Sequence, residues 1–371
     1  MNLLHVHSGN MFGGVERMLE TLAPAYAGEI PIHSCYALCF EGRTAETLER
    51  AGGAVHRLGP VRSRRVDEIW RARRALKGVL ANGSWDAVCV HSAWSQGIFG
   101  PTVLKSGAPL VRWLHAPEPG PRWMEAWSAR SRPSLVICNS DYTRRASGAR
   151  LGSVPVVVTH PPARPLASRP NARTGIRERL GTPRDAVVIL VTARIEHGKG
   201  HDLLLDSLAT LRRVPWEAWI VGGPQRAAEH AYMEELRAKS AGVPGRVHFA
   251  GDQPDVGDWM AAADIYCQPN RSPDSFGLAF VEALAAGLPV ITTRLGAAPE
   301  IVDGSCGILI APAKAAELTD ALRSLVENPA TRQRMAAAAR ERARDFCDLD
   351  RSVTRLADAL RAVTASSLSL T

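Results

Sequence analysis

The stretch IYCQPNRSPDSFGLAFVEALAAGLPVITT, residues 265–293, contains a complete strand–helix–strand pattern. Its two ends, residues 265–268 and 289–293, are short apolar runs typical of buried strands. Between them a polar turn leads into the helical pattern LAFVEALAAG, which starts at residues 277–278. Strands that alternate with helices are typical of βαβ units, in which a helix joins two parallel strands. This stretch therefore predicts an α/β fold.

The same alternation extends over both halves of the chain. In the first half, short apolar runs predict strands at 2–8, 32–40, 54–58, 87–91, 110–115, 135–139 and 155–159. In the second half, they predict strands at 187–192, 216–222, 247–250, 265–268, 289–293 and 307–310. Residues 314–362 predict helices without a further strand. The fold class that we expect is α/β, with two Rossmann-like, doubly wound parallel sheets.

A Pro- and Arg-rich segment, HPPARPLASRPNARTG at 160–175, has no periodicity and predicts a linker. We therefore expect an N-terminal domain at 1–165 and a C-terminal domain at 166–350. The last helix, at about 351–371, could pack back on the first domain. Because open parallel sheets bind ligands at the carboxyl ends of their strands, we expect a ligand in a cleft that both domains face.

Composition excludes several classes of protein. Among the 371 residues, 46% are hydrophobic and 22% are charged, which is unlike a disordered chain or a coiled-coil rod. No apolar run approaches the ~20 residues of a transmembrane helix. The start, MNLLHVHSGN, does not resemble a signal peptide. The seven cysteines are scattered without zinc spacing. We expect a cytoplasmic protein with buried thiols and no metal.

The charge is distributed unevenly. Residues 1–180 hold 24 basic against 13 acidic side chains, a net +11, whereas residues 181–371 hold 21 against 24, a net −3. An anionic partner should therefore meet the N-terminal half.

A glycine pair follows the first predicted strand. Gly13 and Gly14, in HSGNMFGGVERMLE, precede an amphipathic helix, where glycine lets a ligand approach the amides of the helix N-terminus. A plain strand-to-helix turn would use glycine equally well. The spacing matches neither a dinucleotide fingerprint nor a phosphate-binding P-loop.

Two cations follow the first strand of the second domain. Arg194 and Lys199 lie in RIEHGKG, next to a predicted helix N-terminus that already favours negative charge. They could be exposed loop residues, but their place at the carboxyl end of a strand favours a diphosphate site.

Two carboxylates, Asp274 and Glu282, lie eight residues apart in the stretch quoted first. A carboxylate within the small and apolar residues of a helix is costly to bury without hydrogen-bond donors, so Glu282 indicates a binding role. Asp274 could simply cap the helix. The amides of Phe276, Gly277 and Leu278 form the helix N-terminus and could bind an anion or sugar oxygens.

Taken in order, these segments resemble one family. The set comprises GGVER, His115 after the strand VRWL, then NSDYTRR, RIEHGKG and DSFGLAFVEALAAGLPVI. It resembles the family 4 retaining glycosyltransferases of GT-B fold over nearly the whole chain, and the last block is the most specific.

The resemblance implies a role for each of these residues. Arg194 and Lys199 would hold the diphosphate of a nucleotide-sugar donor, and Glu282 the ribose hydroxyls. The amides of residues 276–278 would bind the donor sugar, and Gly13 and Gly14 would close over the phosphates. His115 would lie near the reacting carbon, unless it is a structural histidine at a strand end.

One position departs from the family. Most members have Glu where this chain has Asp274, whose side chain reaches ~1.5 Å less far. Since both carboxylates are then assigned to donor hydroxyls, none is free to attack the sugar as a nucleophile. The resemblance therefore implies retention by front-face displacement, with no cofactor and no metal. The D-x-D at 348–350 is interpreted as surface.

Two basic segments with tryptophans indicate an acceptor or membrane side. The first, residues 59–80, carries Arg71 and Arg74 around Trp70, with an apolar stripe at Val66, Ile69, Leu76 and Leu80. The second, residues 121–133, carries Trp123 and Trp127 with Arg122, Arg130 and Arg132. Both could contact anionic lipid at the inner face of a membrane, or pack normally on the sheet. The acceptor would be a glycan or lipid-linked.

Two other functions compete with this one. A related GT-B enzyme such as a nucleotide-sugar epimerase would need further catalytic acids, which are not recognisable. A nucleic-acid-binding protein would explain the basic character, but the charge lies in one half without a basic-aromatic stacking motif, so we expect no nucleic acid as partner.

Overall fold

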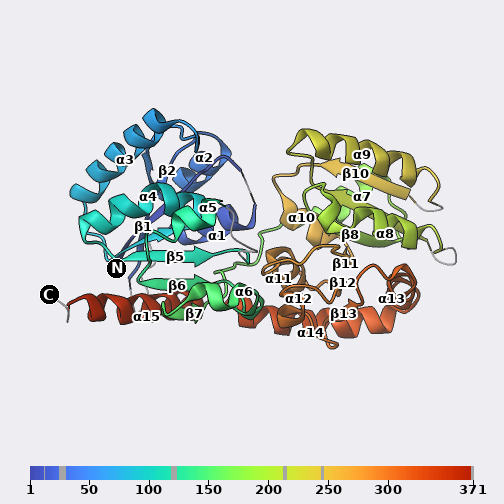
Figure 1. The fold of residues 1–371 in the computed structure, drawn as a ribbon. Helices are drawn as coiled ribbons and strands as arrows, with labels where there is room; N and C mark the ends of the chain where they lie inside the picture. Colours follow the sequence, from blue (N-terminus) through green and yellow to red (C-terminus); the bar gives the residue numbers. More distant parts are fainter. Residues whose placement is uncertain (12, 25–30, 118–122, 212–214, 244–245, 369–371) are drawn as a thin grey trace. The chain divides into compact units, whose positions relative to one another are not determined.

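The computed structural model describes residues 1–371 apart from 12, 25–30, 118–122, 212–214, 244–245 and 369–371 (Figure 1). The chain divides into two compact units. The first comprises Met1–Ala163 together with Asp348–Thr371, and the second comprises Arg164–Cys347.

The first unit is built on a seven-stranded parallel sheet with the order β3-β2-β1-β4-β5-β6-β7. Its strands are β1 (Asn2–His7), β2 (His33–Leu38), β3 (Ala54–Arg57), β4 (Ala87–Val90), β5 (Leu110–Leu114), β6 (Leu135–Cys138) and β7 (Val156–Val158). Its helices are α1 (Gly14–Leu22), α2 (Arg43–Arg50), α3 (Val66–Ala81), α4 (Ala93–Ser106), α5 (Trp123–Ser128), α6 (Asp141–Ser147), the 3-10 turn η1 (Gly148–Leu151) and α15 (Leu349–Leu368). The strand order reverses between β1 and β4, which are paired in parallel.

Alternate residues of these strands face two separate cores. Leu3 packs with Met18 of α1 and with Leu356 of α15 on one face of the sheet. Leu4 packs with Leu76 of α3 on the other face, where α4 also contributes. The last helix of the chain thus belongs to the first unit, as the ribbon also shows (Figure 1).

The second unit has a six-stranded parallel sheet with the order β10-β9-β8-β11-β12-β13. Its strands are β8 (Val187–Thr192), β9 (Trp216–Val221), β10 (Arg246–Gly251), β11 (Ile265–Gln268), β12 (Val290–Thr293) and β13 (Gly307–Ile310). Its helices are α7 (Ala172–Leu180), η2 (His197–Lys199), α8 (His201–Leu208), α9 (Ala227–Ser240), α10 (Val256–Ala262), α11 (Leu278–Ala285), α12 (Ala298–Ile301), α13 (Ala315–Glu327) and α14 (Pro329–Cys347). Here the order reverses between β8 and β11. The expected doubly wound α/β architecture is confirmed for both units.

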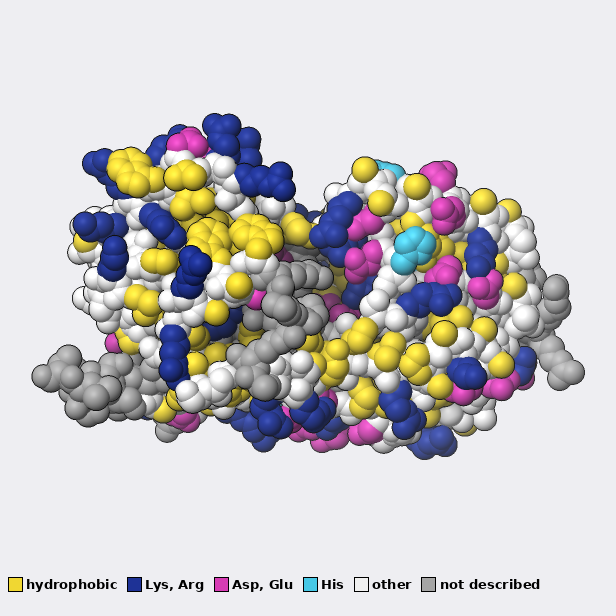
Figure 2. Space-filling model, in the orientation of Figure 1, with side chains coloured by type: hydrophobic (Ala, Val, Ile, Leu, Met, Phe, Trp, Pro, Cys, Tyr) yellow, Lys and Arg dark blue, Asp and Glu magenta, His cyan; other side chains and the backbone are white. Residues whose placement is uncertain are grey.

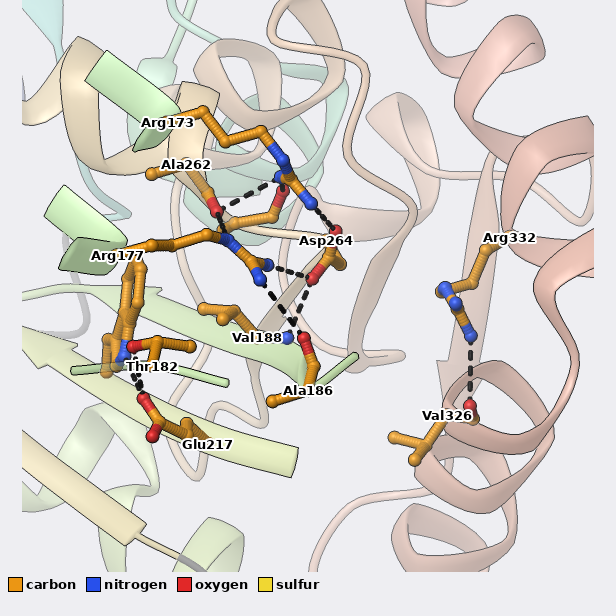
Figure 3. A network of polar contacts seen from close by, with 12 residues as sticks. Arg173, Arg177, Thr182, Ala186, Val188, Glu217, Ala262, Asp264, Val326 and Arg332 are labelled. Atoms are coloured by element: carbon orange, nitrogen blue, oxygen red, sulfur yellow. Dashed lines mark hydrogen bonds and ion pairs between the residues drawn. The ribbon is translucent and has the colours of Figure 1, made fainter. Parts of the chain in front are cut away.

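The prediction of a linker over residues 160–175 is wrong at the C-terminal end of that segment. Residues 160–175 were expected to be irregular, but α7 begins at Ala172 and ends before Gly181, which adopts a left-handed C-cap. Arg173 and Arg177 of this helix both reach Asp264, at 2.7 and 2.5 Å (Figure 3). Asp264 also accepts a hydrogen bond from the amide of Val188, the second residue of β8. These tertiary contacts fix α7 to the second unit, which local periodicity could not indicate.

The region predicted to be helical, residues 314–362, is helical and consists of the three helices α13, α14 and α15. Breaks fall at Asn328 and Asp348, and Pro329 opens the second helix, a position that proline tolerates. Across the described residues, none of the helices combines the length and the hydropathy that crossing a bilayer requires.

Candidate active site

In each sheet, the carboxyl ends of the strands at the reversal of strand order are where ligands bind in open α/β folds. In the second unit these strands are β8 and β11. Lys199 follows β8 in the turn η2, and Asp274 follows β11. The two side chains form an ion pair, with Nζ 2.9 Å from Oδ2. Topology therefore brings together two residues that the sequence singled out separately.

Asp274 is held by two further donors. The side-chain amide nitrogens of Asn270 and Gln268 lie 3.1 and 3.3 Å from the same Oδ2 atom and donate hydrogen bonds to it. Both side chains are buried, and the hydroxyl of Tyr266 donates to Oε1 of Gln268 at 2.8 Å. Three donors on one oxygen stabilise the charged carboxylate. A polar network from β11 thus orients the carboxylate that faces Lys199.

Glycines allow the loops of this site to approach each other. Gly200, directly after Lys199, has φ +72°, and a Cβ there would lie 2.0 Å from the carbonyl oxygen of Pro269. At Gly296 a Cβ would lie 2.1 Å from the carbonyl oxygen of Asp274. Since side chains cannot be accommodated at either place, the backbone itself determines the positions of Lys199 and Asp274.

The N-terminus of α11 starts at Leu278, after Gly277 with φ +94°. Phe276 is buried and contacts the ring of Phe346 with 6.1 Å between centroids. The first amides of an α-helix lack intrahelical acceptors, so this end can bind an anion or sugar oxygens. The structure thus has the predicted helix start at residues 277–278.

Glu282 lies one turn into α11 and lines a small cavity of about 240 Å³. The cavity is also bounded by Leu166 and Ser168 of the linker and by Gly257 and Met260 of α10. A Cβ at Gly257 would lie 2.1 Å from the carbonyl oxygen of Ala167, so glycine is needed for this close packing. Glu282 is therefore a partly buried carboxylate beside a space that a ligand group can enter.

Arg194 is paired differently from Lys199. Its guanidinium contacts the carboxylate of Glu196, and its Nε lies 3.5 Å from Oε1 of Glu229. Glu229 in turn accepts hydrogen bonds from the amides of Gln225 and Arg226. The described contacts of Arg194 are thus with its own loop and with α9, whereas Lys199 contacts Asp274 after β11.

In the first unit, Gly13 caps α1 and Gly14 is its first residue. The amide of Gly13 donates to Oε2 of Glu16 at 2.8 Å, and Oε1 of Glu16 lies 2.7 Å from Nε2 of His7. His7 ends β1, the strand at the reversal of order. The glycine turn is therefore tied to the carboxyl end of the sheet through a buried carboxylate.

His115 follows β5 and belongs to a row of histidines. Its Nε2 lies 2.8 Å from Nδ1 of His91, and Nε2 of His91 lies 3.0 Å from Nδ1 of His5. Burial lowers the pKa of His115 to about 3, with smaller contributions from His7 and Arg112. Burial likewise lowers the pKa of His5 to about 3 and that of His91 well below its ordinary value. These rings are neutral at pH 7.

Sequence reasoning missed His5, His7, His91 and Glu16 as members of this cluster. A signal was present, because the segments LHVH and VCVH both end an apolar strand in histidine. The order β1-β4-β5, which makes these ends neighbours, is not visible in the sequence.

The apolar stripe predicted on α3 is divided between two environments. Leu76 and Leu80 are buried, with Ile69 packed against the same core, so most of the stripe faces the sheet. Val66 and Trp70 instead remain 78% and 60% exposed. Of the two alternatives for this stripe, packing on the sheet therefore holds for Ile69, Leu76 and Leu80, whereas Val66 lies on the surface.

On the face of the first unit that Figure 2 shows, Lys and Arg side chains lie beside exposed hydrophobic ones. The guanidinium of Arg74 lies 5.6 Å from the ring centroid of Trp70, and Arg71 pairs with Asp67 at 2.8 Å. Trp123 is 62% exposed and stacks on Trp127 with 6.2 Å between centroids. Arg122 lies outside the described residues.

Two doubly wound parallel sheets of this kind define the GT-B class of glycosyltransferases, and solved structures of that class match nearly the whole chain. Anabaena HepE in complex with UDP-glucose covers 98% of this chain and is itself covered completely, with a TM-score of 0.85 and 23% identity. At that identity the likeness concerns the fold.

The family is shown by the sequence comparisons. Residues 12–165 match the model of glycosyltransferase family 4, and residues 172–342 match that of glycosyl transferases group 1. The chain belongs to family 4 of the glycosyltransferases. A D-inositol 3-phosphate glycosyltransferase of Nocardioides sp. is 32% identical over 74% of this chain and 67% of its own length. A phosphatidyl-myo-inositol mannosyltransferase of Mycobacterium leprae is 29% identical over 72% of this chain and 71% of its own length.

Proposed function

We propose that this glycosyltransferase transfers a hexose from a nucleotide-diphosphate sugar to a glycan or lipid-linked acceptor, with retention of the anomeric configuration. The observation that carries the proposal is the ion pair of Lys199 with Asp274 at the strand ends where the sheet order reverses. The pair supplies a cation for a diphosphate and a carboxylate for a neighbouring hydroxyl group.

The donor contacts that we propose follow the geometry of the second unit. Lys199 and Arg194 bind the diphosphate, and the first amides of α11, at residues 276–278, bind the donor sugar. Glu282 accepts hydrogen bonds from the ribose hydroxyls. In the first unit, Gly13 and Gly14 bind the phosphates through the α1 N-terminus, and His115 contacts the sugar hydroxyls.

Retention follows from a front-face displacement in this proposal. The bond from the sugar C1 to the phosphate oxygen breaks, and the acceptor oxygen forms its bond to C1 on the same face. The acceptor proton passes to the departing phosphate oxygen. Lys199 and Arg194 neutralise the charge that develops on the diphosphate, which is the role that a metal has in other enzymes, so the proposed reaction needs no metal.

The acceptor that we propose is anionic, because residues 1–180 carry a net charge of +11. Inositol phosphates and phosphatidylinositol belong in the acceptor panel, since the names of two relatives contain them. The exposed Trp70 with Arg71 and Arg74 supports peripheral contact with the anionic inner face of a membrane. Trp123 and Trp127 form the second part of this acceptor side.

The experiment is a matrix of donors and acceptors. The protein is incubated with UDP-, GDP- and ADP-sugars and with inositol phosphate, glycan and lipid-linked acceptors, and released nucleoside diphosphate is measured. NMR of the product then gives the anomeric configuration. We expect acceptor-dependent release with one donor class and a product of unchanged configuration. An inverted product would contradict the mechanism, and conversion of the donor to its epimer would favour the alternative enzyme.

A further inference from the structure

His5, His91 and His115 form a continuous hydrogen-bonded chain across three neighbouring strands. The two links join Nδ1 of His5 to Nε2 of His91, at 3.0 Å, and Nδ1 of His91 to Nε2 of His115, at 2.8 Å. Neighbouring rings are nearly coplanar, with interplanar angles of 26° and 22°. Coplanar rings at these distances have the geometry of N–H···N hydrogen bonds. The three histidine rings therefore form one continuous hydrogen-bonded row.

The neutrality of the rings restricts where the protons can lie. A neutral imidazole carries one N–H and one bare nitrogen, so it donates at one nitrogen and accepts at the other. His91 uses both nitrogens within the chain. Consequently both links point in the same direction, either outward from His5 to His115 or inward from His115 to His5.

The buried end of the chain decides between these directions. His5 is fully buried, and its remaining nitrogen, Nε2, has no hydrogen-bond partner among the described residues. If the links pointed inward, this nitrogen would carry a proton without an acceptor. A buried N–H without an acceptor is rarer in proteins than an acceptor without a donor. The outward direction leaves only a bare nitrogen there and is therefore favoured.

We infer that His5 and His91 are positioning residues that fix the tautomer of His115, with its proton on Nδ1. His115 is the least buried of the three, so its Nδ1 is the end of the chain that a ligand can reach. It presents a fixed hydrogen-bond donor to an oxygen atom of the ligand. That this oxygen belongs to the donor sugar rests on the proposed function.

This arrangement also excludes one role for His115. The lone pair of Nε2 accepts the hydrogen bond from His91, and Nδ1 already carries a proton. His115 therefore has no bare nitrogen to offer the acceptor hydroxyl and is not the base of the reaction. The acceptor proton must go to another group, as it does when the departing phosphate oxygen takes it.

NMR spectroscopy tests the inference without any transferase activity. In full-length protein labelled with ¹⁵N-histidine, long-range ¹H–¹⁵N spectra distinguish the protonated from the bare ring nitrogen, and His115→Gln identifies the His115 signals. We expect a proton on Nδ1 and a bare Nε2 in His115 at pH 7. A His115 with its proton on Nε2, or a rapid mixture of both forms, would overturn the inference.

A variant separates a positioning role from a structural one. His91→Phe keeps an aromatic ring but removes both links, so the Nδ1-protonated form of His115 should no longer dominate the spectrum. With an active donor, kcat should fall about tenfold while KM for the donor changes little, because a misplaced catalytic contact affects chemistry more than binding. His230→Phe, on the exposed side of α9, is the control.

The outcomes are distinguishable from those of the proposed function. If His91→Phe lowers only the melting temperature and leaves the His115 tautomer unchanged, the chain is structural and the inference fails. If the tautomer is as expected but no nucleotide-sugar is turned over, the proposed function fails while the proton assignment stands.

Discussion

Lys199 and Asp274 form an ion pair, 2.9 Å between Nζ and Oδ2, although 75 residues separate them in the chain. They follow β8 and β11, the adjacent strands at which the order of the second sheet reverses. About a quarter of each side chain is exposed, so the pair is accessible to a ligand. A diphosphate that approaches Lys199 would share the positive charge of this lysine with Asp274. The carboxylate of Asp274 therefore has a role in orienting the lysine side chain.

Asp274→Asn should lower kcat/KM about tenfold, because the amide keeps the size of the side chain but loses the charge that orients Lys199. Asp274→Glu keeps the charge and should remain active or change its donor preference. Turnover of the preferred nucleotide-sugar measures both variants. The control is Asp320→Asn, which removes an exposed pair with Arg323. An Asp274→Asn enzyme with unchanged kcat/KM would contradict this role.

Gly200→Ala should destabilise the protein by about 3 kcal/mol, since its φ of +72° disfavours a side chain and the new Cβ would meet the Pro269 carbonyl oxygen at 2.0 Å. Gly175→Ala, the same substitution inside α7 with open space around it, should stabilise by about 0.5–1 kcal/mol. Urea unfolding of the two variants gives both values. Equal effects of the two substitutions would show that the Gly200 turn is not constrained as described.

Stability should fall on acidification between pH 7 and pH 5. The pKa of His5 is about 3 in the folded protein because burial disfavours its charged form, whereas the unfolded chain takes up a proton near 6.5. The unfolded state therefore binds more protons in this window, and stability is lost as the pH falls below 6.5. By pH 5, His5 alone should cost about 2 kcal/mol.

Urea unfolding at several pH values checks this dependence. His5→Asn, which cannot take up a proton, should reduce the loss between pH 7 and pH 5 by about that amount. A variant with the same pH dependence as the natural chain would rule out His5 as the source.

Arg74→Ala should weaken binding to vesicles of anionic phosphatidylglycerol several-fold, since a basic residue near such a surface contributes about 1 kcal/mol. Arg237→Ala is the matched control, because Arg237 lies 5.3 Å above the ring of Phe249 much as Arg74 lies above Trp70. Co-sedimentation with vesicles measures both. A membrane role for α3 would be contradicted if the natural chain bound phosphatidylcholine vesicles as strongly as phosphatidylglycerol vesicles. It would also be contradicted if both variants lost binding to the same extent.

The fold was largely predictable from the sequence, because buried parallel strands are short apolar runs that can be recognised one by one. The strands differ from their expected bounds by no more than two residues at either end. The start of α7 was not predictable, since Arg173 and Arg177 are fixed by Asp264, which lies 91 and 87 residues further along the chain.

The candidate site was predictable as separate residues but not as a network. Lys199 and Asp274 could be selected by their motifs. The buried Gln268, which ends β11, and Asn270, which follows it, orient Asp274 but gave no signal in the sequence. His91 became meaningful only through the strand order that places it between His5 and His115.

The central claim is that Lys199 binds the diphosphate of a nucleotide-sugar, and calorimetry with UDP, GDP and ADP tests it most directly. The natural chain should bind one of these, and Lys199→Met should weaken that binding about 10- to 100-fold, as expected for the loss of a charge-assisted contact. Lys239→Met, which removes a lysine paired with Asp206 on α8, should bind as the natural chain does. Equal affinity of the Lys199→Met variant and the natural chain would contradict the account.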